Sequence, residues 1–344
     1  MNPSFFSLPI KLSCWKICIG CGCLMLPLSG IIAQKTISHF VFFNLDRERI
    51  QEMSFLQASN LTGAQLKYTW RELEPEKDQY EFAAIRQDLA YLRAHNKRMF
   101  IQVQDVTFDT ARVNVPDYIL EEEVYHGGVA IQYMTDEQDN IIRQDGYVSR
   151  RWDGEVAKRF HLLLQALGQA FDGQLEGINL PETSVGFGET GALYPAGFTP
   201  DSYRDAILAQ MEAAKQAFSQ SVVIQYANFM PGEWLPWENK GYLESLYQFA
   251  KDNDIGMGGP DIKIYKKAQM NHSYKFLKAY SSELISGMAV QWGNYEEINP
   301  KTGKQVTVEE IYQFGQTEVD LNYIFWSTQE PFYSNQLLPF LNRL

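Results

Sequence analysis

The chain has 344 residues, of which 45% are hydrophobic and 14% aromatic, and its formal net charge at pH 7 is −12. This length allows one large α/β domain or two smaller ones. The acidic balance argues against nucleic acid and anionic polymers as ligands, because phosphate and uronate groups bind to clustered basic side chains.

The N-terminal 33 residues have the pattern of an export signal. A basic flank that ends at Lys16 precedes an uncharged apolar stretch, 17–33, with small residues near its end. We expect cleavage after Ala33, which makes the mature protein secreted or periplasmic, without stable insertion in a membrane. The alternative, an uncleaved N-terminal membrane anchor, is disfavoured by Pro27 and by a length near the lower limit for a spanning helix.

Cysteine and histidine usage excludes several kinds of site. All four cysteines fall within the predicted signal, so the mature chain has no disulfide scaffold, no Cys-ligated zinc and no Cys nucleophile. The five histidines are scattered, with neither an HxH pair nor an HExxH motif. We therefore expect no metal and no other cofactor, and a GxSxG nucleophile elbow is also absent from the sequence.

Beyond the signal, apolar runs alternate with amphipathic stretches. Continuous apolar runs are typical of strands buried on both faces, and their alternation with helices indicates a parallel sheet wrapped by helices. Eight runs predict strands, at residues 39–45, 63–70, 97–106, 175–180, 221–229, 255–262, 285–292 and 319–326. Eight stretches predict helices, at residues 47–58, 80–95, 151–171, 199–219, 241–251, 273–284, 306–317 and 335–342. We therefore predict a single (β/α)8 barrel, a TIM barrel, over residues 34–344.

Residues 113–151 interrupt this alternation after the third predicted strand. Two strand-like segments, 127–133 and 140–142, flank an acidic turn, which predicts a β-hairpin inserted into the barrel. The competing fold, a doubly wound sheet, would place a glycine-rich phosphate loop after the first strand. The corresponding segment, 43–46 (Phe-Asn-Leu-Asp), holds no glycine.

A carboxylate stands directly after the fourth predicted strand. That strand stops at Pro181, and the next residue is Glu182. Alternation along the strand puts Glu182 on the side of Ile178 and Leu180, which places it above the barrel interior if those two residues fill it. Barrel enzymes carry their chemistry at the carboxyl ends of strands, so Glu182 is the candidate general acid. Glu189, seven residues further on, is a second carboxylate in a glycine-rich loop.

The remaining strand ends are rich in amides, aromatic residues and carboxylates and poor in cations. Sugars need this mixture, because their hydroxyls pair with amides and carboxylates while their rings stack on aromatic side chains. The partner that these residues predict is a neutral carbohydrate. The residues expected to hold it are Trp70, Gln104, Asn179, Tyr226, Gln291 and Trp326.

The segment Gly63–Val106 carries the pattern W-x-x-L-E-P…Y-x-F, which begins at Trp70. It resembles the second and third units of cellulase-like and β-galactosidase-like (β/α)8 glycoside hydrolases. That resemblance implies a retaining mechanism, with an acid/base glutamate ending the fourth strand and a nucleophile glutamate ending the seventh. The first role carries over to Glu182, although Pro181 replaces the asparagine that usually precedes it.

The nucleophile that the resemblance implies has no direct counterpart, because Gln291 stands at the end of the seventh predicted strand. A glutamine does not ionise and cannot replace a carboxylate nucleophile. Three possibilities follow. Glu296 acts as nucleophile from the following loop, Asp261 acts as base for a water with inversion, or the site binds sugar without cleaving it. We therefore expect an exported glycoside hydrolase, with a non-hydrolytic carbohydrate-binding barrel as the alternative.

Overall fold

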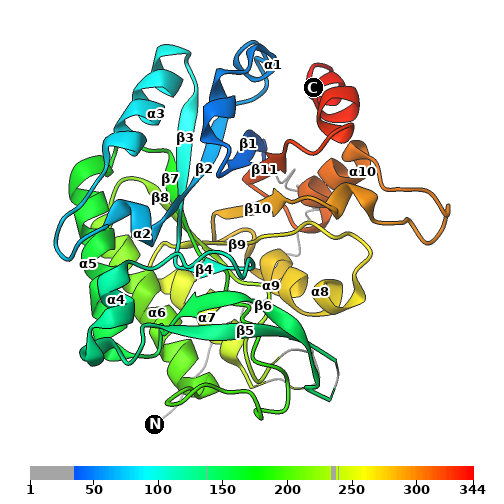
Figure 1. Ribbon diagram of the computed structural model, residues 1–344. Coiled ribbons are helices and arrows are strands. Elements are labelled where there is room, and N and C mark those ends of the chain that lie inside the picture. The colour runs from blue at the N-terminus through cyan, green and yellow to red at the C-terminus, as the bar shows by residue number, and fades with distance from the viewer. Residues whose placement is uncertain (1–34, 137, 234–237, 239) are drawn as a thin grey trace, which may run out of the picture. The chain divides into compact units, whose positions relative to one another are not determined.

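Eight parallel strands close into a barrel (Figure 1) in the computed structural model, which describes residues 35–344 apart from 137, 234–237 and 239. The predicted signal lies outside the described residues. Around the barrel the strands follow the order β1-β11-β10-β9-β8-β7-β3-β2, which confirms the predicted (β/α)8 fold. The barrel strands are β1 (Ser38–Asn44), β2 (Gly63–Thr69), β3 (Arg98–Gln104), β7 (Gly177–Leu180), β8 (Val222–Tyr226), β9 (Gly256–Gly259), β10 (Ser286–Val290) and β11 (Tyr323–Ser327).

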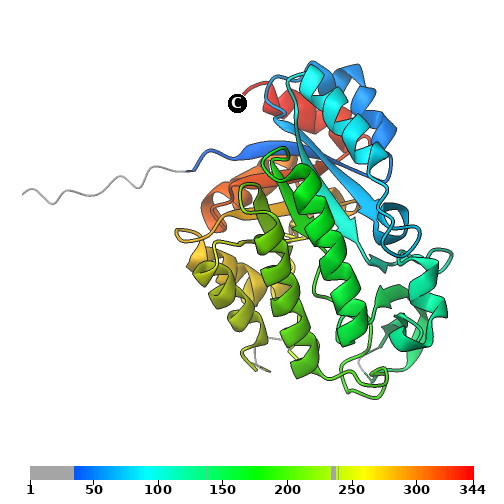
Figure 2. The same cartoon turned by 90° about the vertical axis from the view of Figure 1, so that its left-hand side faces the viewer.

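Helices connect successive strands, and the two longest, α5 and α6, lie side by side on the outside of the barrel (Figure 2). The α-helices are α1 (Met53–Leu56), α2 (Trp70–Leu73), α3 (Ala83–Ala94), α4 (Asp117–Glu121), α5 (Gly154–Phe171), α6 (Pro200–Ala217), α7 (Tyr242–Asp252), α8 (Lys267–Asn271), α9 (Ser273–Tyr280), α10 (Val308–Gln313) and α11 (Leu338–Leu341). Short 3-10 or π turns extend several of them, namely η1 (Arg47–Gln51), η2 (Glu123–Tyr125), η4 (Asn294–Glu296), η5 (Phe314–Glu318) and η6 (Tyr333–Leu337). In the part of the chain that the structure describes, no helix combines the length and apolar character needed to cross a membrane.

Alternate residues of each strand point into the barrel, and several of the side chains inside it are aromatic. The Phe100 ring packs edge-on against Phe40 and Phe325, with centroid distances of 5.1 and 5.0 Å. Such edge-to-face contacts stabilise aromatic clusters beyond the burial of their area. The interior cluster consists of Phe40, Phe42, Phe100, Ile224, Tyr226, Ala289 and Phe325.

The fourth barrel strand, β7, has the opposite phase to the one expected from its sequence. Ile178 and Leu180 belong to the large core between strands and helices, whereas Asn179 faces the interior, where it bonds Gln65 of β2. The expectation that Ile178 and Leu180 fill the barrel was therefore wrong. Glu182 nevertheless lines the cavity at the end of the barrel, because regular strand geometry stops at Leu180 and alternation no longer determines its direction.

Glycines in β9 let this strand approach its neighbour closely. A Cβ added to Gly258 would lie 1.7 Å from the carbonyl oxygen of Gly287 in β10. We expect Gly258→Ala to lower the free energy of unfolding by about 3 kcal/mol or more, because the backbone must move to relieve the clash. Urea denaturation measures this. Gly154→Ala is the control, since an added Cβ there meets nothing within 4 Å, and equal stability of the two variants would contradict the prediction.

The predicted hairpin insertion after the third barrel strand is confirmed, and it is longer than expected. Strands β5 (Val129–Thr135) and β6 (Ile141–Ser149) pair antiparallel. A two-residue strand, β4 (Val106–Thr107), adds to β6 and completes a three-stranded sheet, β4-β6-β5 (Figure 1). Only Asp105 separates β3 from β4, so the inserted sheet grows directly from a barrel strand. A segment as short as β4 has no periodicity from which to predict it.

Candidate active site

A cavity of about 260 Å³ lies at the carboxyl ends of the barrel strands. Carboxamides dominate its polar lining, together with two carboxyl groups and two cations. The strands and the residues just after them contribute Asn44, Lys67, Gln102, Gln104, Glu182, Tyr226, Pro260 and Gln291. The segment that follows β3 contributes Val106, Thr107, Phe108, Asp109, Arg112 and Asn114. The cavity thus brings together four residues predicted for the site: Gln104, Glu182, Tyr226 and Gln291.

On balance, the surroundings of Glu182 favour the protonated, neutral form of its carboxyl group. Burial raises its pKa to about 7, and the negative charge of Asp261 acts in the same direction. A hydrogen bond from Asn228 Nδ2 to Glu182 Oε2 (2.8 Å) favours the carboxylate, as do the charges of Arg151 and Lys67. Burial is the largest of these effects. A glutamic acid with a pKa near 7 can donate a proton at neutral pH, which an ordinary exposed glutamate cannot do.

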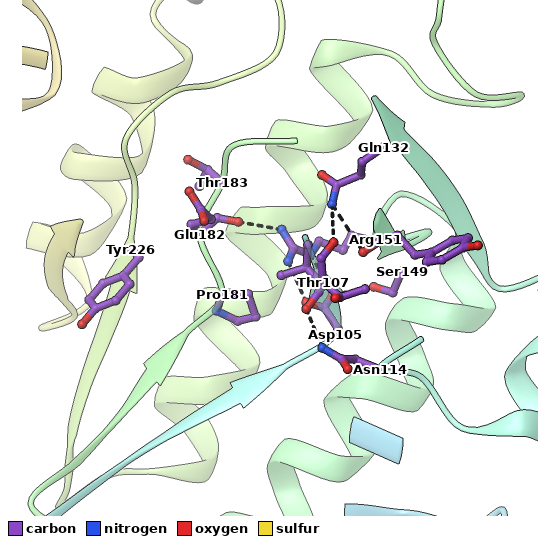
Figure 3. A network of polar contacts seen from close by, with 12 residues as sticks. Asp105, Thr107, Asn114, Gln132, Ser149, Arg151, Pro181, Glu182, Thr183 and Tyr226 are labelled. Carbon is purple, nitrogen blue, oxygen red and sulfur yellow. Dashed lines mark hydrogen bonds and ion pairs between the residues drawn. The ribbon is translucent and has the colours of Figure 1, made fainter. Parts of the chain in front are cut away.

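A buried network fixes the backbone beside this acid (Figure 3). Arg151 follows β6 and binds Asp105 through two bonds, Nε–Oδ2 at 2.7 Å and Nη2–Oδ1 at 2.6 Å. Its Nη1 donates to the carbonyl oxygen of Glu182 (2.9 Å) and to the hydroxyl of Tyr203 (2.8 Å). Tyr203 in turn donates to the carbonyl oxygen of Thr183. The network thus holds two successive carbonyl groups at the point where the chain leaves β7.

The inserted sheet braces the loop that carries Glu182. Gln132 of β5 accepts the N–H of Gly186 at 3.0 Å, and the N–H of Tyr133 donates to the Gly186 carbonyl at 2.8 Å. Asp139, in the hairpin turn, accepts hydrogen bonds from the backbone of Glu189 (2.6 Å) and Thr190 (2.8 Å). These bonds lower the pKa of Asp139. The hairpin therefore contacts and orders the loop that carries the acid.

Lys67 lines the cavity but is not among the residues that the sequence predicts for the site. Its ammonium lies over the Phe42 ring, 5.4 Å from the centroid, and burial lowers its pKa to about 8 while the charge of Glu182 opposes that decrease. Among the described residues it has no hydrogen-bond acceptor. The residues Gly63 and Gln65 share its phase in β2, so period-two alternation was the signal that could have placed Lys67 inside the barrel.

Three of the predicted sugar-binding residues lie outside the cavity. Trp70 and Trp326 are both 0% exposed and belong to the core between strands and helices. Their indole N–H groups bond Glu74 and His39, respectively. Asn179 lies deeper in the barrel than the cavity and is bonded by Gln65. The two tryptophans are therefore core residues and not the sugar-stacking residues that we predicted. A position near a strand end does not determine the direction of a side chain.

The carboxylates considered as partners of Glu182 do not line the cavity. Asp261 directly follows the cavity residue Pro260, and its Oδ1 accepts from Asn294 Nδ2 at 2.8 Å. Glu296 lies in η4 and accepts from Gln329 Nε2 at 2.6 Å. Glu189 is exposed. Of these, Asp261 has a charge that raises the pKa of Glu182.

The neighbours of Glu182 should shift its titration in opposite directions. Asp261→Asn removes a negative charge and is expected to lower the pKa of Glu182. Asn228→Ala removes a hydrogen bond to the carboxylate and is expected to raise it. Infrared difference titration of the carboxyl band measures both shifts without requiring activity. Shifts of the same sign in the two variants would contradict this account of the electrostatics.

Comparison with known proteins gives similarity at the level of structure. No protein-family model matches the chain, and no curated protein matches it. Xylanase 10B from Thermotoga petrophila, in complex with xylobiose, is 9% identical and has a TM-score of 0.50, covering 85% of this chain and 82% of that one. A psychrophilic family 10 endo-β-1,4-xylanase is 12% identical with a TM-score of 0.50, covering 84% of this chain and 86% of that one.

A β-galactosidase from the Antarctic haloarchaeon Halorubrum lacusprofundi is 10% identical, with a TM-score of 0.54. The match covers 84% of this chain and 52% of the β-galactosidase, so this chain corresponds to about half of that protein. At such identities the likeness establishes the fold. The chain has the (β/α)8 barrel on which these glycoside hydrolases are built, in agreement with the resemblance seen in the sequence.

Proposed function

We propose that this protein is a glycoside hydrolase that cleaves a neutral oligo- or polysaccharide, with Glu182 as the acid that protonates the glycosidic oxygen. The observation that carries the proposal is the partly buried Glu182, with a pKa of about 7, in a cavity at the carboxyl ends of the barrel strands. This is the position at which barrel enzymes hold their catalytic groups. A raised pKa is the property that a glycosidase acid needs.

The rest of the lining suits a polyhydroxylated ligand. Gln104, Gln291 and the other carboxamides offer both donors and acceptors to sugar hydroxyls, and Tyr226 adds a ring and a hydroxyl. Lys67 has three N–H donors and no acceptor among the described residues, so sugar hydroxyls can accept from it as well. The lining holds two cations, Lys67 and Arg112, and two carboxyl groups, Glu182 and Asp109, in an otherwise amide-rich cavity. This balance supports a neutral substrate rather than a polyanion.

Two residues of the chain, Asp261 and Glu296, are candidates for the second catalytic group. Asp261 is the better candidate, because its charge already influences Glu182, and as a base for water it would give inversion. Glu296 as nucleophile would give retention. Carboxyl separations of about 5 Å and about 6.5–9.5 Å distinguish retaining from inverting enzymes, respectively.

We also propose export to the periplasm or the exterior, followed by cleavage after Ala33. The support is the basic flank and the apolar stretch 17–33 in the sequence. The alternative is anchoring of the same segment in the membrane. N-terminal sequencing of the protein recovered from its native compartment decides between them.

Gln291 favours a second candidate function, a barrel that binds carbohydrate without cleaving it, because an amide stands where a nucleophile is expected. The test is the release of reducing ends from a panel of neutral glycans, with binding measured on the same panel by calorimetry. Hydrolysis of at least one glycan supports the enzyme. Binding without hydrolysis would establish the alternative and overturn the proposed function.

A further inference from the structure

Two glutamine side chains in the cavity wall carry an amide oxygen that has no hydrogen-bond donor. Gln102 and Gln104 are 5% and 7% exposed, and both side chains line the cavity. The Oε1 atom of each has no partner. Leaving a buried acceptor without a hydrogen bond costs about 1–3 kcal/mol of free energy. A ligand with N–H or O–H donors can form the missing hydrogen bonds at this wall.

The cavity also lacks a second carboxylate in a position suited to attack. Gln291 follows β10 and cannot act as a nucleophile. Apart from Glu182, the described lining holds one carboxylate, Asp109, whose Oδ2 lies 3.3 Å from Arg112 Nε in an exposed pair. The Asp109 Oδ1 atom accepts the N–H of Ala111. Both oxygens of this rim residue are thus engaged.

We propose that the substrate supplies the missing nucleophile: the sugar bound in this cavity carries a 2-acetamido group, whose carbonyl oxygen attacks the anomeric carbon. A minority of glycosidases are known to use such substrate assistance. The acetamido N–H donates to the unpaired Oε1 of Gln102 or Gln104. This inference rests on the proposed hydrolase function and names its substrate class, a neutral 2-acetamido sugar.

The reaction balances with the groups present. The acetamido oxygen forms a bond to C1 while the bond from C1 to the leaving oxygen breaks, and Glu182 gives its proton to that oxygen. The product of this step is a bicyclic oxazolinium and an alcohol. Water then attacks C1 and passes a proton to Glu182, and the ring opens to restore the acetamide. Neither Asp261 nor Glu296 takes part.

The cavity is small. Its volume of about 260 Å³ is below the ~300–1,000 Å³ typical of drug-sized ligand pockets.

A preorganised internal nucleophile provides a high effective concentration, so the chemistry does not require a second protein carboxylate at bonding distance.

The test compares paired aryl glycosides that differ only in carrying a 2-acetamido or a 2-hydroxyl group, in both the gluco and galacto series and both anomers. We expect kcat/KM to be at least about 10³-fold higher for the acetamido member of the cleaved pair. Stepwise fluorination of the acetyl group should slow cleavage, because fluorine withdraws electrons from the attacking oxygen. A thiazoline analogue of the bicyclic intermediate should bind at least about 10²-fold more tightly than the parent sugar.

Two amide variants locate the effect. Gln102→Leu or Gln104→Leu should weaken binding of the 2-acetamido sugar by about tenfold, depending on which of the two residues accepts the acetamido N–H. Gln269→Leu is the matched control, since its Oε1 is also buried and unpaired but lies outside the cavity. Equal cleavage of 2-hydroxyl glycosides would overturn this inference while the hydrolase function stands. Absence of cleavage in every pair, with no thiazoline binding, would also overturn this inference, and the panel of neutral glycans then decides the hydrolase function separately.

Discussion

Glu182→Gln is expected to lower the rate of glycan hydrolysis at pH 7 by about 10²–10⁴-fold, the usual contribution of a positioned general acid. The substituted amide has nearly the same shape, and its oxygen can still accept the hydrogen bond that Asn228 gives to Glu182. It has no proton to donate to a leaving group. Sugar binding should therefore persist, so the loss appears in kcat rather than in KM.

The same variant has a predicted effect on stability that requires no substrate. The pKa of Glu182 rises from 4.5 to about 7 on folding, so the wild-type protein loses stability relative to the glutamine variant as pH increases through that interval. Wild-type activity should fall in turn as pH rises through about 7, since only the protonated form donates. Denaturation midpoints and pH–rate profiles measure the two effects.

Glu189→Gln is the control, because this residue is exposed in the same loop. It should change the rate by no more than about twofold. Activity of Glu182→Gln close to that of wild type would remove Glu182 from the acid role.

Arg151→Met should be the most destabilising single change near the site. The side chains of Arg151 and Asp105 are 3% and 1% exposed, and truncating one partner leaves the other as an uncompensated buried charge. The expected decrease in the free energy of unfolding is about 3–5 kcal/mol. Loss of the Arg151 charge also raises the pKa of Glu182 further, so the alkaline limb of the activity profile should move to higher pH in any folded fraction.

Two comparisons separate a positioning role from a purely structural one. Arg159→Met breaks another buried pair, with Glu74 and the neighbouring Asp78, and should destabilise comparably while leaving the pH profile unchanged. Arg151→Met combined with Asp105→Leu removes both charges, which should recover much of the stability. It should not recover kcat, because the Glu182 carbonyl still lacks its donor. Recovery of both would mean that Arg151 acts through stability alone.

The sequence was sufficient for the barrel because its signals there are redundant. Apolar runs and amphipathic stretches recur many times, so errors of a few residues at individual boundaries leave the alternation intact. The position of Glu182 followed from one strong local signal, a strand stopped by Pro181. Glu182 does line the cavity, although Ile178 and Leu180 do not fill the barrel interior.

The other site residues depended on phase, which a short strand determines poorly. Phe325 points into the barrel and Trp326 points away from it, a difference of one residue that no composition reveals. Lys67 was missed for the same reason, since it lies within β2 rather than after it. The network around Arg151 joins residues far apart in sequence, such as Asp105 and Tyr203, and only the folded chain brings them together.

The barrel and the inserted sheet have separate structural roles. The barrel strands and helices fold around their own cores, whereas the loop that presents Glu182 is held by Gln132, Asp139 and Arg151, all within or beside the hairpin. Changes in the hairpin can therefore alter where the acid points without weakening the scaffold. Over evolutionary divergence, such a module could be exchanged or remodelled to suit new ligands while the barrel stays the same, and it is the natural segment to graft when the reactivity of the site is to be redesigned.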